Sequence, residues 1–356
     1  MLKITTIVGA RPQFVKASRL SAALKAAGIR ENILHTGQHY HDRLSRIFFR
    51  ELKLKKPTLN LGIGSMAHGQ QTAAMLAKLE SCLIRNRPDG VLVYGDTNST
   101  LAGALAAAKL QIPMIHIEAG LRSYNRTMPE EINRIVTDQL ATLLFAPTRL
   151  AVSNLKKEGI RSGVHFSGDV MADSLQHFLP IAMKQSAIQK RFRAIHHKYQ
   201  LLTLHRPSNA DDLSRLKKIL WIIEKSGVPT VFPVHPRTQK IISKIRGKRS
   251  NVIFFIPPVG YLDMLVLQKN AVRILTDSGG IQKEAYLLKV PCITIRSETE
   301  WKETTQHGWN QVVGRNLDNL VRFLSRPAKP GKWLPYYGNG KASTKIAKTI
   351  RHFFKI

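Results

Sequence analysis

Cysteine and carboxylate side chains are the two things this 356-residue sequence has little of. Its two cysteines, Cys82 and Cys292, exclude a disulfide framework and fit a reducing compartment, so we expect a cytoplasmic protein. The apolar run at the N-terminus is too short for a secretory signal. No run approaches the roughly 18 apolar residues that a membrane span needs. We therefore expect a soluble chain with no membrane partner.

Acidic residues are scarce beside basic ones, with 23 Asp and Glu against 55 Lys and Arg, for a net charge of +32. Such an excess is typical of nucleic-acid-binding proteins, and that function stays an alternative. The basic residues are scattered, however, and the sequence has no zinc-ligand spacing, no recognition-helix signature and no motif that mixes basic and aromatic residues. The pattern favours a generally basic surface that attracts a small anionic substrate, with no nucleic acid as partner.

Signals for metals and dinucleotides are also missing. The segment HTGQHYHD carries His35, His39, His41 and Asp42, but Gly37 interrupts the helical register that would align the first two histidines. No thiolates or further clustered ligands lie nearby. The loop after the first expected strand lacks the GxGxxG fingerprint of dinucleotide sites. We expect neither a metal nor a cofactor.

The sequence does contain short apolar, β-branched runs that alternate with helical segments. Because these runs are almost continuously apolar, they predict parallel strands covered by helices on both faces, which is a doubly wound α/β fold. The expected strands are 3–8, 32–36, 91–95, 114–117 and 143–146 in the first half, and 201–205, 230–235, 252–255, 272–277 and 292–295 in the second.

The two halves repeat one another. Segments 91–117 and 272–295 both run through a strand, an Asp, small residues, a helix, a Lys, a Pro and a second strand. A chain of this length also exceeds what one core usually supports. We therefore predict two Rossmann-like domains, residues 1–169 joined by a C-terminal helix at 341–356, and residues 170–340.

Charged side chains follow the expected strands of the first half. Ligands of open α/β sheets bind beyond the carboxyl ends of the strands. The loop GARPQFVKA brings Arg11 and Lys16 near a helix N-terminus, which suits an anion. Asp96 could cap the helix that follows it, and Glu130 could complement a helix dipole. Glu118 directly follows a buried strand and has no capping role, so these acids are candidate general acids and bases.

Two histidine and arginine pairs follow expected strands of the second half. LHRPSN holds His205 and Arg206, and VHPRT holds His235 and Arg237. Such a pair can bind a diphosphate or transfer protons. We expect both pairs to face the segment TDSGG.

The segment TDSGGIQKEA opens an expected helix. A nucleophile elbow needs glycine two residues before its serine, where this chain has Thr276, so Ser278 is not interpreted as a nucleophile. Ser278, Gly279 and Gly280 instead predict a phosphate cradle of backbone N–H groups at a helix N-terminus. Glu284 would lie on the side of that helix able to reach ribose hydroxyls. The sequence thus predicts a nucleotide-diphosphate site in the second half and carboxylate chemistry in the first.

Nine blocks of the sequence resemble the non-hydrolysing UDP-N-acetylglucosamine 2-epimerases, in order and across nearly the whole chain. They are GARPQFVKA, TGQHYHD, YGDTNSTLAGALAA, HIEAGLRS, PEEINR, LHRPSN, VHPRT, TDSGGIQKEA and PCITIRSETEW. The resemblance implies the GT-B fold, with two Rossmann-like domains, an active site in the cleft between them, and a homodimer.

The resemblance also implies a reaction, the reversible epimerisation of a UDP-sugar at C2 through elimination and re-addition of UDP. It matches Asp96, Glu118 and Glu130 to catalytic carboxylates, and leaves open which acid serves which face of the sugar. Arg134 and His205 match positions linked to activity. The matched UDP-binding positions are Arg11, Lys16, Ser278, Gly279, Gly280 and Glu284.

Two blocks are similar to a particular branch of that family. ARPQF and SETEW are closer to enzymes acting on UDP-2,3-diacetamido-2,3-dideoxyglucuronate, because Gln13 replaces a Glu and leaves a more basic environment for a uronate. Lys283 stands where many members have an acid, and we expect it on a solvated helix face. Products of either branch would feed surface polysaccharide or lipopolysaccharide synthesis. A GT-B glycosyltransferase, which would share the fold and the UDP-sugar site, is the second alternative.

Overall fold

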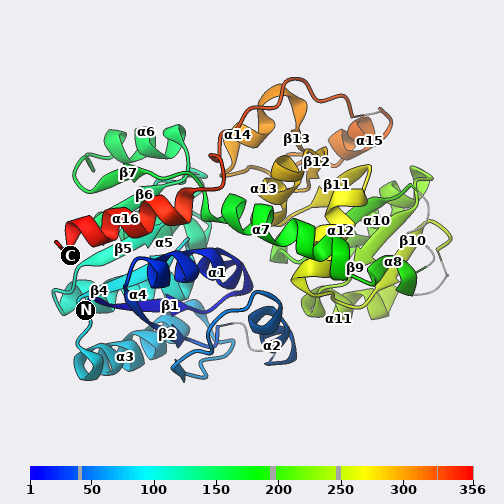
Figure 1. Cartoon of the computed structure of the whole chain (residues 1–356). Helices are drawn as coiled ribbons and strands as arrows, with labels where there is room; N and C mark the ends of the chain where they lie inside the picture. The colour runs from blue at the N-terminus through cyan, green and yellow to red at the C-terminus, as the bar shows by residue number, and fades with distance from the viewer. Residues whose placement is uncertain (39–41, 193–197, 246–249, 327, 356) are drawn as a thin grey trace. The chain divides into compact units, whose positions relative to one another are not determined.

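The computed structural model of the chain describes all residues except 39–41, 193–197, 246–249, 327 and 356 (Figure 1). Its contacts divide the chain into two compact units. Unit 1 consists of Met1–Gln176 and Pro335–Ile356, and unit 2 of His177–Leu334. Units defined by contacts are not the same thing as functional domains, so the boundaries expected after residues 169 and 340 stay predictions.

Unit 1 is built on a seven-stranded sheet in the order β3-β2-β1-β4-β5-β6-β7, and its neighbouring strands are parallel. The order reverses between β1 and β4, and ligands of such sheets bind beside the carboxyl ends of the strands at that point. The strands are β1 (Lys3–Val8), β2 (Arg30–His35), β3 (Leu59–Asn60), β4 (Gly90–Tyr94), β5 (Met114–Ile117), β6 (Leu143–Ala146) and β7 (Val164–Phe166).

The helices of unit 1 follow its strands along the chain. They are α1 (Arg11–Ala26), α2 (Asp42–Glu51), α3 (His68–Asn86), α4 (Asn98–Lys109), α5 (Pro129–Leu140), α6 (Arg149–Lys157) and α16 (Ala342–Phe353), while α7 (Val170–Gln185) crosses into unit 2. Proline lies in the first turn of both α1 and α5, where a missing N–H costs nothing. None of the helices in the described part of the chain is long and apolar enough to cross a membrane.

The C-terminal helix α16 packs against α1, so the end of the chain joins the unit in which it begins (Figure 1). Its buried face carries Ile346, Ala347 and Ile350, at the spacing of one helical stripe. The carboxylate of Asp173 accepts hydrogen bonds from the backbone N–H groups of Ala342 (3.1 Å) and Ser343 (2.7 Å). This contact satisfies two N–H groups that the helix itself leaves unbonded.

Unit 2 repeats the strand order of unit 1, with a parallel six-stranded sheet in the order β10-β9-β8-β11-β12-β13. Its switch point lies between β8 and β11. The strands are β8 (Gln200–Thr203), β9 (Thr230–Pro233), β10 (Ile253–Ile256), β11 (Arg273–Thr276), β12 (Cys292–Thr294) and β13 (Asn310–Val312). The helices are α8 (Ile188–Arg191), α9 (Pro207–Ala210), α10 (Leu213–Lys225), α11 (Pro236–Ile245), α12 (Tyr261–Asn270), α13 (Gly279–Leu288), α14 (Lys302–Thr305), the 3-10 helix η2 (Gln306–Gly308) and α15 (Asp318–Leu324).

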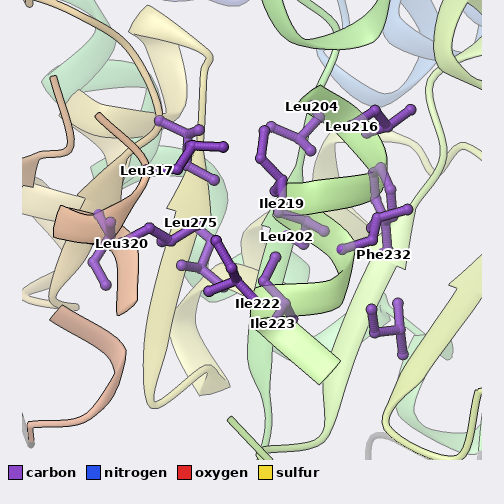
Figure 2. Packing of buried hydrophobic residues seen from close by; sticks show 14 of the residues in the cluster. Leu202, Leu204, Leu216, Ile219, Ile222, Ile223, Phe232, Leu275, Leu317 and Leu320 are labelled. Carbon is purple, nitrogen blue, oxygen red and sulfur yellow. The ribbon is translucent and has the colours of Figure 1, made fainter. Parts of the chain in front are cut away.

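The core of unit 2 lies between its sheet and the helices α10 and α15 (Figure 2). Leu216, Ile219 and Ile223 on α10 are fully buried and recur every three or four residues, so they form one apolar stripe. They pack with Leu202 of β8 and Leu275 of β11. Burying one such side chain contributes roughly 1.5–3 kcal/mol. This packing holds β8 and β11, the two strands at the switch point.

The prediction of two similar Rossmann-like domains is therefore confirmed. All ten expected strands are present, with ends that shift by a residue or two. The strands β3, β7 and β13 were not expected, and each is two or three residues long at the edge of its sheet. A strand of two or three residues is too short to show an apolar run, so the sequence pattern does not reveal it.

Candidate functional site

Lys16 and Glu118 form an ion pair at the carboxyl edge of the sheet in unit 1. Lys16 comes from α1 and Glu118 directly follows β5, and their side chains are 9% and 6% exposed. Gly95, which follows β4, lies against the pair, because a Cβ atom there would be 3.0 Å from Glu118 Oε2 and 3.3 Å from Lys16 Nζ. The fold thus brings together two of the expected site residues that are 102 positions apart.

The backbone of Glu118 adopts a conformation that few residues other than glycine accept, with φ of 75°. Backbone N–H groups of Glu118 and Ala119 both donate to the carbonyl oxygen of Phe145 on β6, at 3.1 Å each. A left-handed non-glycine residue costs on the order of 1 kcal/mol and persists where its surroundings hold it. Such a conformation at the end of a buried strand is compatible with the functional role expected of Glu118, which stays a prediction.

Asp96 pairs with Arg134 of α5. The Asp96 side chain is 29% exposed, whereas the Arg134 side chain is 3% exposed, so a buried cation holds a carboxylate that still reaches the surface. The interpretation of Asp96 as the cap of α4 is wrong. Thr97 caps that helix, since its hydroxyl accepts from the backbone N–H of Thr100.

The neighbouring acids Glu130 and Glu131 have different environments. Glu131 is 1% exposed and accepts hydrogen bonds from Ser123 N (2.9 Å), Ser123 Oγ (2.9 Å) and Tyr124 N (2.8 Å), besides its ion pair with Arg134. It therefore fixes the loop that follows β5. Glu130 lies half-buried in the first turn of α5. The sequence pattern does not separate these two roles, because both acids are adjacent in one helical turn.

Gln13 joins the two turns at the switch point of unit 1. Its Oε1 accepts from Gly9 N (2.7 Å) and Ala10 N (3.0 Å), and its Nε2 donates to the carbonyl oxygen of Tyr94 (2.8 Å). The side chain is buried with both ends bonded, so it shapes the turns and does not itself contact a substrate carboxylate. Arg11, half-buried beside it on α1, has its pKa lowered by burial.

Asp277 of the segment TDSGG organises the site in unit 2. Its buried carboxylate accepts from the backbone N–H groups of His205 (3.1 Å) and Arg206 (2.9 Å), and lies 3.2 Å from His205 Nδ1. Burial alone would raise the pKa of Asp277, but His205 and the hydrogen bonds from Arg206 and Asn209 hold that pKa below its usual range. Asp277 thus orients His205, so that a ligand would meet the ring at Nε2. The ring of His235 lies 5.3 Å away from that of His205.

The turn from β11 into α13 is closely packed. Ser278 precedes the first turn, where Gly279 and Gly280 lie. A Cβ atom at Gly279 would be 2.4 Å from Glu300 Oε1 and 3.3 Å from Trp301 Nε1. Glycine is therefore needed here because another loop passes against the helix N-terminus. This geometry is compatible with the expected phosphate cradle, which stays a prediction.

Lys283 is not on a solvated helix face, as the sequence led us to expect. It is 0% exposed, and its ammonium group lies 4.1 Å from the centre of the Trp301 ring, where the π face attracts a cation. Its neighbour Glu284 is also buried and accepts a hydrogen bond from Gln268 Nε2 at 2.7 Å. Burial raises the pKa of Glu284 to about 7. The helix α13 is covered on almost every side, which periodicity in one helix does not reveal.

Two further side chains that the sequence analysis considered have local partners. Arg237 forms a two-bond pair with Asp211 at the surface, at 2.9 and 2.6 Å. His35 Nδ1 accepts from Gly37 N at 2.8 Å, while His39 and His41 lie outside the described residues. Across the described residues, no group of three His, Cys, Asp or Glu side chains could hold a metal ion.

Two Rossmann-type units with these polar groups at their switch points define a nucleotide-sugar enzyme of the GT-B class. The model of one family, UDP-N-acetylglucosamine 2-epimerase, matches residues 22–351. The chain belongs to this family, whose members are isomerases.

Curated relatives and solved structures match nearly the whole chain. A UDP-N-acetylglucosamine 2-epimerase homolog of Methanococcus maripaludis is 48% identical over 99% of this chain and 100% of its own length. The UDP-2,3-diacetamido-2,3-dideoxy-D-glucuronate 2-epimerase of Pseudomonas aeruginosa is 45% identical over 98% of this chain and 99% of its own. The crystal structure of Methanocaldococcus jannaschii UDP-GlcNAc 2-epimerase with UDP-GlcNAc and UDP is similar at a TM-score of 0.93 and 43% identity, covering 99% of this chain and 100% of that one.

Proposed function

We propose that this chain reversibly epimerises a UDP-2-acetamido sugar at C2, without hydrolysing it. The observation that carries the proposal is the pairing of Glu118 with Lys16 and of Asp96 with Arg134 at the carboxyl edge of one sheet. Both carboxylates lie where ligands of such sheets bind, and carboxylates are groups that move protons in catalysis. A relative that was crystallised with UDP-GlcNAc and UDP supports the substrate class.

The reaction we propose begins with departure of UDP, because no carbonyl group makes the C2 proton acidic. Positive charge develops at C1 as the C1–O bond breaks, and a carboxylate removes the C2 proton on the opposite face. The neutral 2-acetamidoglucal and UDP are the products of this elimination. Re-addition of UDP, with a proton delivered to the other face of C2, completes the epimerisation and requires two acid–base groups.

We assign the chemistry to different sets of residues. Asp96, Glu118 and Glu130 move the proton. The leaving diphosphate meets Arg11, His205 and the backbone N–H groups that open α13, because donors aimed at developing negative charge lower the barrier. The UDP-binding set is completed by Lys16, His235, Arg237, Ser278, Gly279, Gly280 and Glu284.

The exact sugar is either UDP-GlcNAc, giving UDP-ManNAc, or the 2,3-diacetamido-glucuronate analogue. Relatives that carry the two names are 44% and 45% identical to the chain, so identity favours neither. We propose that either product feeds surface polysaccharide or lipopolysaccharide synthesis in the cytoplasm, and that the enzyme is a homodimer. Light scattering after size exclusion tests the dimer, and comparison of kcat/KM for the two sugars identifies the substrate.

The central experiment follows C2 by NMR while the protein turns over each UDP-sugar in D₂O. We expect the C2 proton signal to disappear and the epimer to accumulate with no acceptor present. A C2 proton signal that persists in every UDP-sugar would contradict the proposal. A glycosyltransferase would leave that proton in place, and a hydrolysing epimerase would release free N-acetylmannosamine and UDP as its main products.

Substituting Glu118 by Gln tests the division of roles between the residue sets. We expect Glu118→Gln to lower turnover by on the order of 10²–10⁴-fold, as for loss of an acid–base group, and to retain UDP affinity. Glu80→Gln, which removes an exposed acid on α3, serves as the matched control and should keep full activity. Loss of UDP binding in Glu118→Gln would contradict the assignment.

Two other functions remain as alternatives. A Streptomyces glycosyltransferase matches at 15% identity and a TM-score of 0.53, which concerns the fold alone. The net charge of +32 is the reason to test nucleic acid. Tight RNA or DNA binding at physiological salt, together with an absence of UDP binding, would favour that function over ours.

A further inference from the structure

Two turns carry the proposed catalytic carboxylates of unit 1. Asp96 lies in the turn after β4 and follows Gly95, whose φ is 63°. Glu118 lies in the turn after β5 and is followed by Gly120, whose φ is 81°. Gly95 and Gly120 both take left-handed backbone conformations. The distance between the carboxylates of Asp96 and Glu118 therefore depends on the contacts that fix these two turns.

One buried carboxylate, Asp138 of α5, is linked to both turns. Its Oδ2 accepts a hydrogen bond from the backbone N–H of Gly120 at 3.1 Å. Its Oδ1 lies 2.7 Å from Nδ1 of His116 on β5, and Nε2 of that histidine lies 2.8 Å from the carbonyl oxygen of Gly95. His116 and Asp138 are 0% and 1% exposed, so they make these links inside the protein and do not contact substrate.

The partners of His116 determine which protons its ring carries. A carbonyl oxygen can only accept, so Nε2 of His116 donates to Gly95, and beside an ionised Asp138 the ring donates from Nδ1 as well, as an imidazolium ion. Two carboxylates, Asp138 and Glu158, balance the two cations His116 and Arg122 in this cluster. Arg122 donates to Asp138 Oδ2 at 2.7 Å and to Glu158 through two bonds of 2.7 and 2.5 Å. His116, Arg122, Asp138 and Glu158 together form a neutral chain, which lowers the cost of burying each charge.

The ion pair of Lys16 and Glu118 lies against Gly95, where a Cβ atom would be 3.0 Å from Glu118 Oε2 and 3.3 Å from Lys16 Nζ. Gly95 is also bonded to β5 through its N–H, which donates to the Ile117 carbonyl oxygen at 2.9 Å. His116 therefore fixes the carbonyl oxygen of Gly95, whose N–H group is already fixed by Ile117. Loss of the His116 bond would remove this donor from the carbonyl oxygen of Gly95, the residue that lies against the ion pair.

We propose that His116 and Asp138 are positioning residues that set the separation of Asp96 and Glu118 for the proton transfers at C2. This inference rests on the proposed function. The dyad works only with His116 doubly protonated and Asp138 ionised. A displacement of about 1 Å in reacting groups can cost about 10²-fold in rate, so a buried link of this kind is enough to control turnover.

The variants His116→Gln and Asp138→Asn test the proposal. A Gln amide at position 116 cannot reach both Asp138 and Gly95, which lie at the two different nitrogens of the His116 ring. Asn at position 138 removes the negative charge that the His116 imidazolium needs. We expect each to lower kcat for C2 proton exchange about 10–100-fold, while KM and the UDP Kd stay within about threefold. The double variant should be no slower than the slower single variant, because both changes break one link.

His165→Gln is the matched control. His165 lies on β7 of the same sheet, where its ring stacks on that of Phe145 at 5.5 Å, and it stands outside the hydrogen-bonded chain that runs from Asp138 to Gly95. It should keep wild-type kcat. Activity of His116→Gln and Asp138→Asn equal to that of the control would overturn the proposal, as would a loss confined to KM.

A second measurement does not depend on whether the variants fold. In the wild-type protein labelled with ¹³C and ¹⁵N, the ring signals of His116, assigned by through-bond correlation to its own backbone, should show protons on both ring nitrogens at pH 7.5. A neutral ring would contradict the proposal. If the wild-type enzyme leaves every UDP-sugar unlabelled in D₂O, the proposed function fails, and the NMR result still decides whether the dyad is built as we infer.

Discussion

Burial changes the chemistry of single residues that the sequence places only on a helix. Glu284 and Lys283 are neighbours on α13, and the pattern of residues would allow both to reach solvent. In the fold both are buried, Lys283 against the Trp301 ring and Glu284 beside Gln268. A buried acid favours its neutral form, whereas a cation against an aromatic face keeps its charge. One residue of the pair is therefore sensitive to pH near neutrality.

Stability of unit 2 should fall as pH rises through about 7, because burial raises the pKa of Glu284 from 4.5 to about 7. The stabilisation that Glu284 contributes is fully present below pH 4.5, and it is lost above the pKa of about 7 in the folded protein. The difference between pH 5 and pH 8 is about 3 kcal/mol. Glu284→Gln should remove most of it. Urea unfolding of both proteins at the two pH values measures the change.

Tryptophan fluorescence makes this measurement specific to unit 2, since all four tryptophans, Trp221, Trp301, Trp309 and Trp333, lie in it. The control is Glu80→Gln in unit 1, which should leave the fluorescence transition as in the wild type. An unchanged pH dependence in Glu284→Gln would show that this carboxyl titrates at its ordinary value in the fold.

At the scale of elements, local pattern predicts strands and helices well and predicts their contacts poorly. The apolar run before Asp277 is a strand and Gly279 begins a helix, as expected. Asp277 holds the turn after β8 only because β8 and β11 are neighbours in the sheet. In the sequence, 72 residues separate Asp277 from His205. Charged residues at strand ends could therefore be named in advance, whereas their partners could not.

Gly279→Ala should disturb the N-terminus of α13. A Cβ atom there would lie 2.4 Å from Glu300 Oε1, and that carboxylate is paired with Arg296 at 2.9 Å, so it cannot move without loss. We expect the UDP Kd to rise about tenfold or more, which corresponds to about 1.4 kcal/mol. Isothermal titration calorimetry with UDP measures it.

The control for this substitution is Gly69→Ala in the first turn of α3, where an added Cβ meets nothing within 4 Å. Alanine there should keep UDP affinity and stabilise the helix by up to about 1 kcal/mol. Equal UDP affinity in Gly279→Ala and Gly69→Ala would mean that the turn at α13 does not bind the diphosphate.

At the scale of the whole molecule, charge is the dominant property. The 55 basic and 23 acidic residues make a field that attracts anions over distances longer than a contact. Salt shortens that distance, from about 30 Å at 0.01 M to about 3 Å at 1 M. A large positive charge does not require a nucleic-acid partner. It would also attract a substrate that carries a nucleotide diphosphate.

UDP should therefore bind more slowly as salt increases. We expect its association rate constant to fall about tenfold between 20 mM and 500 mM NaCl, as for electrostatically steered association. Uridine, which has no charge, is the matched ligand and should show no such fall. Stopped-flow fluorescence measures both, and an equal salt dependence for the two ligands would exclude steering by the net charge.

The sequence by itself determined the alternation of strands and helices, the parallel sheets, the repeat of two similar halves and the positions of polar residues after strands. These properties depend on runs of residues that are adjacent along the chain, so periodicity reveals them. Only the tertiary structure decided which polar groups meet. The pair of Lys16 with Glu118, the link from Asp138 through His116 to Gly95, and the burial of Lys283 all join residues of different elements. Strand order and packing create these neighbours, and neither leaves a local signal in the sequence.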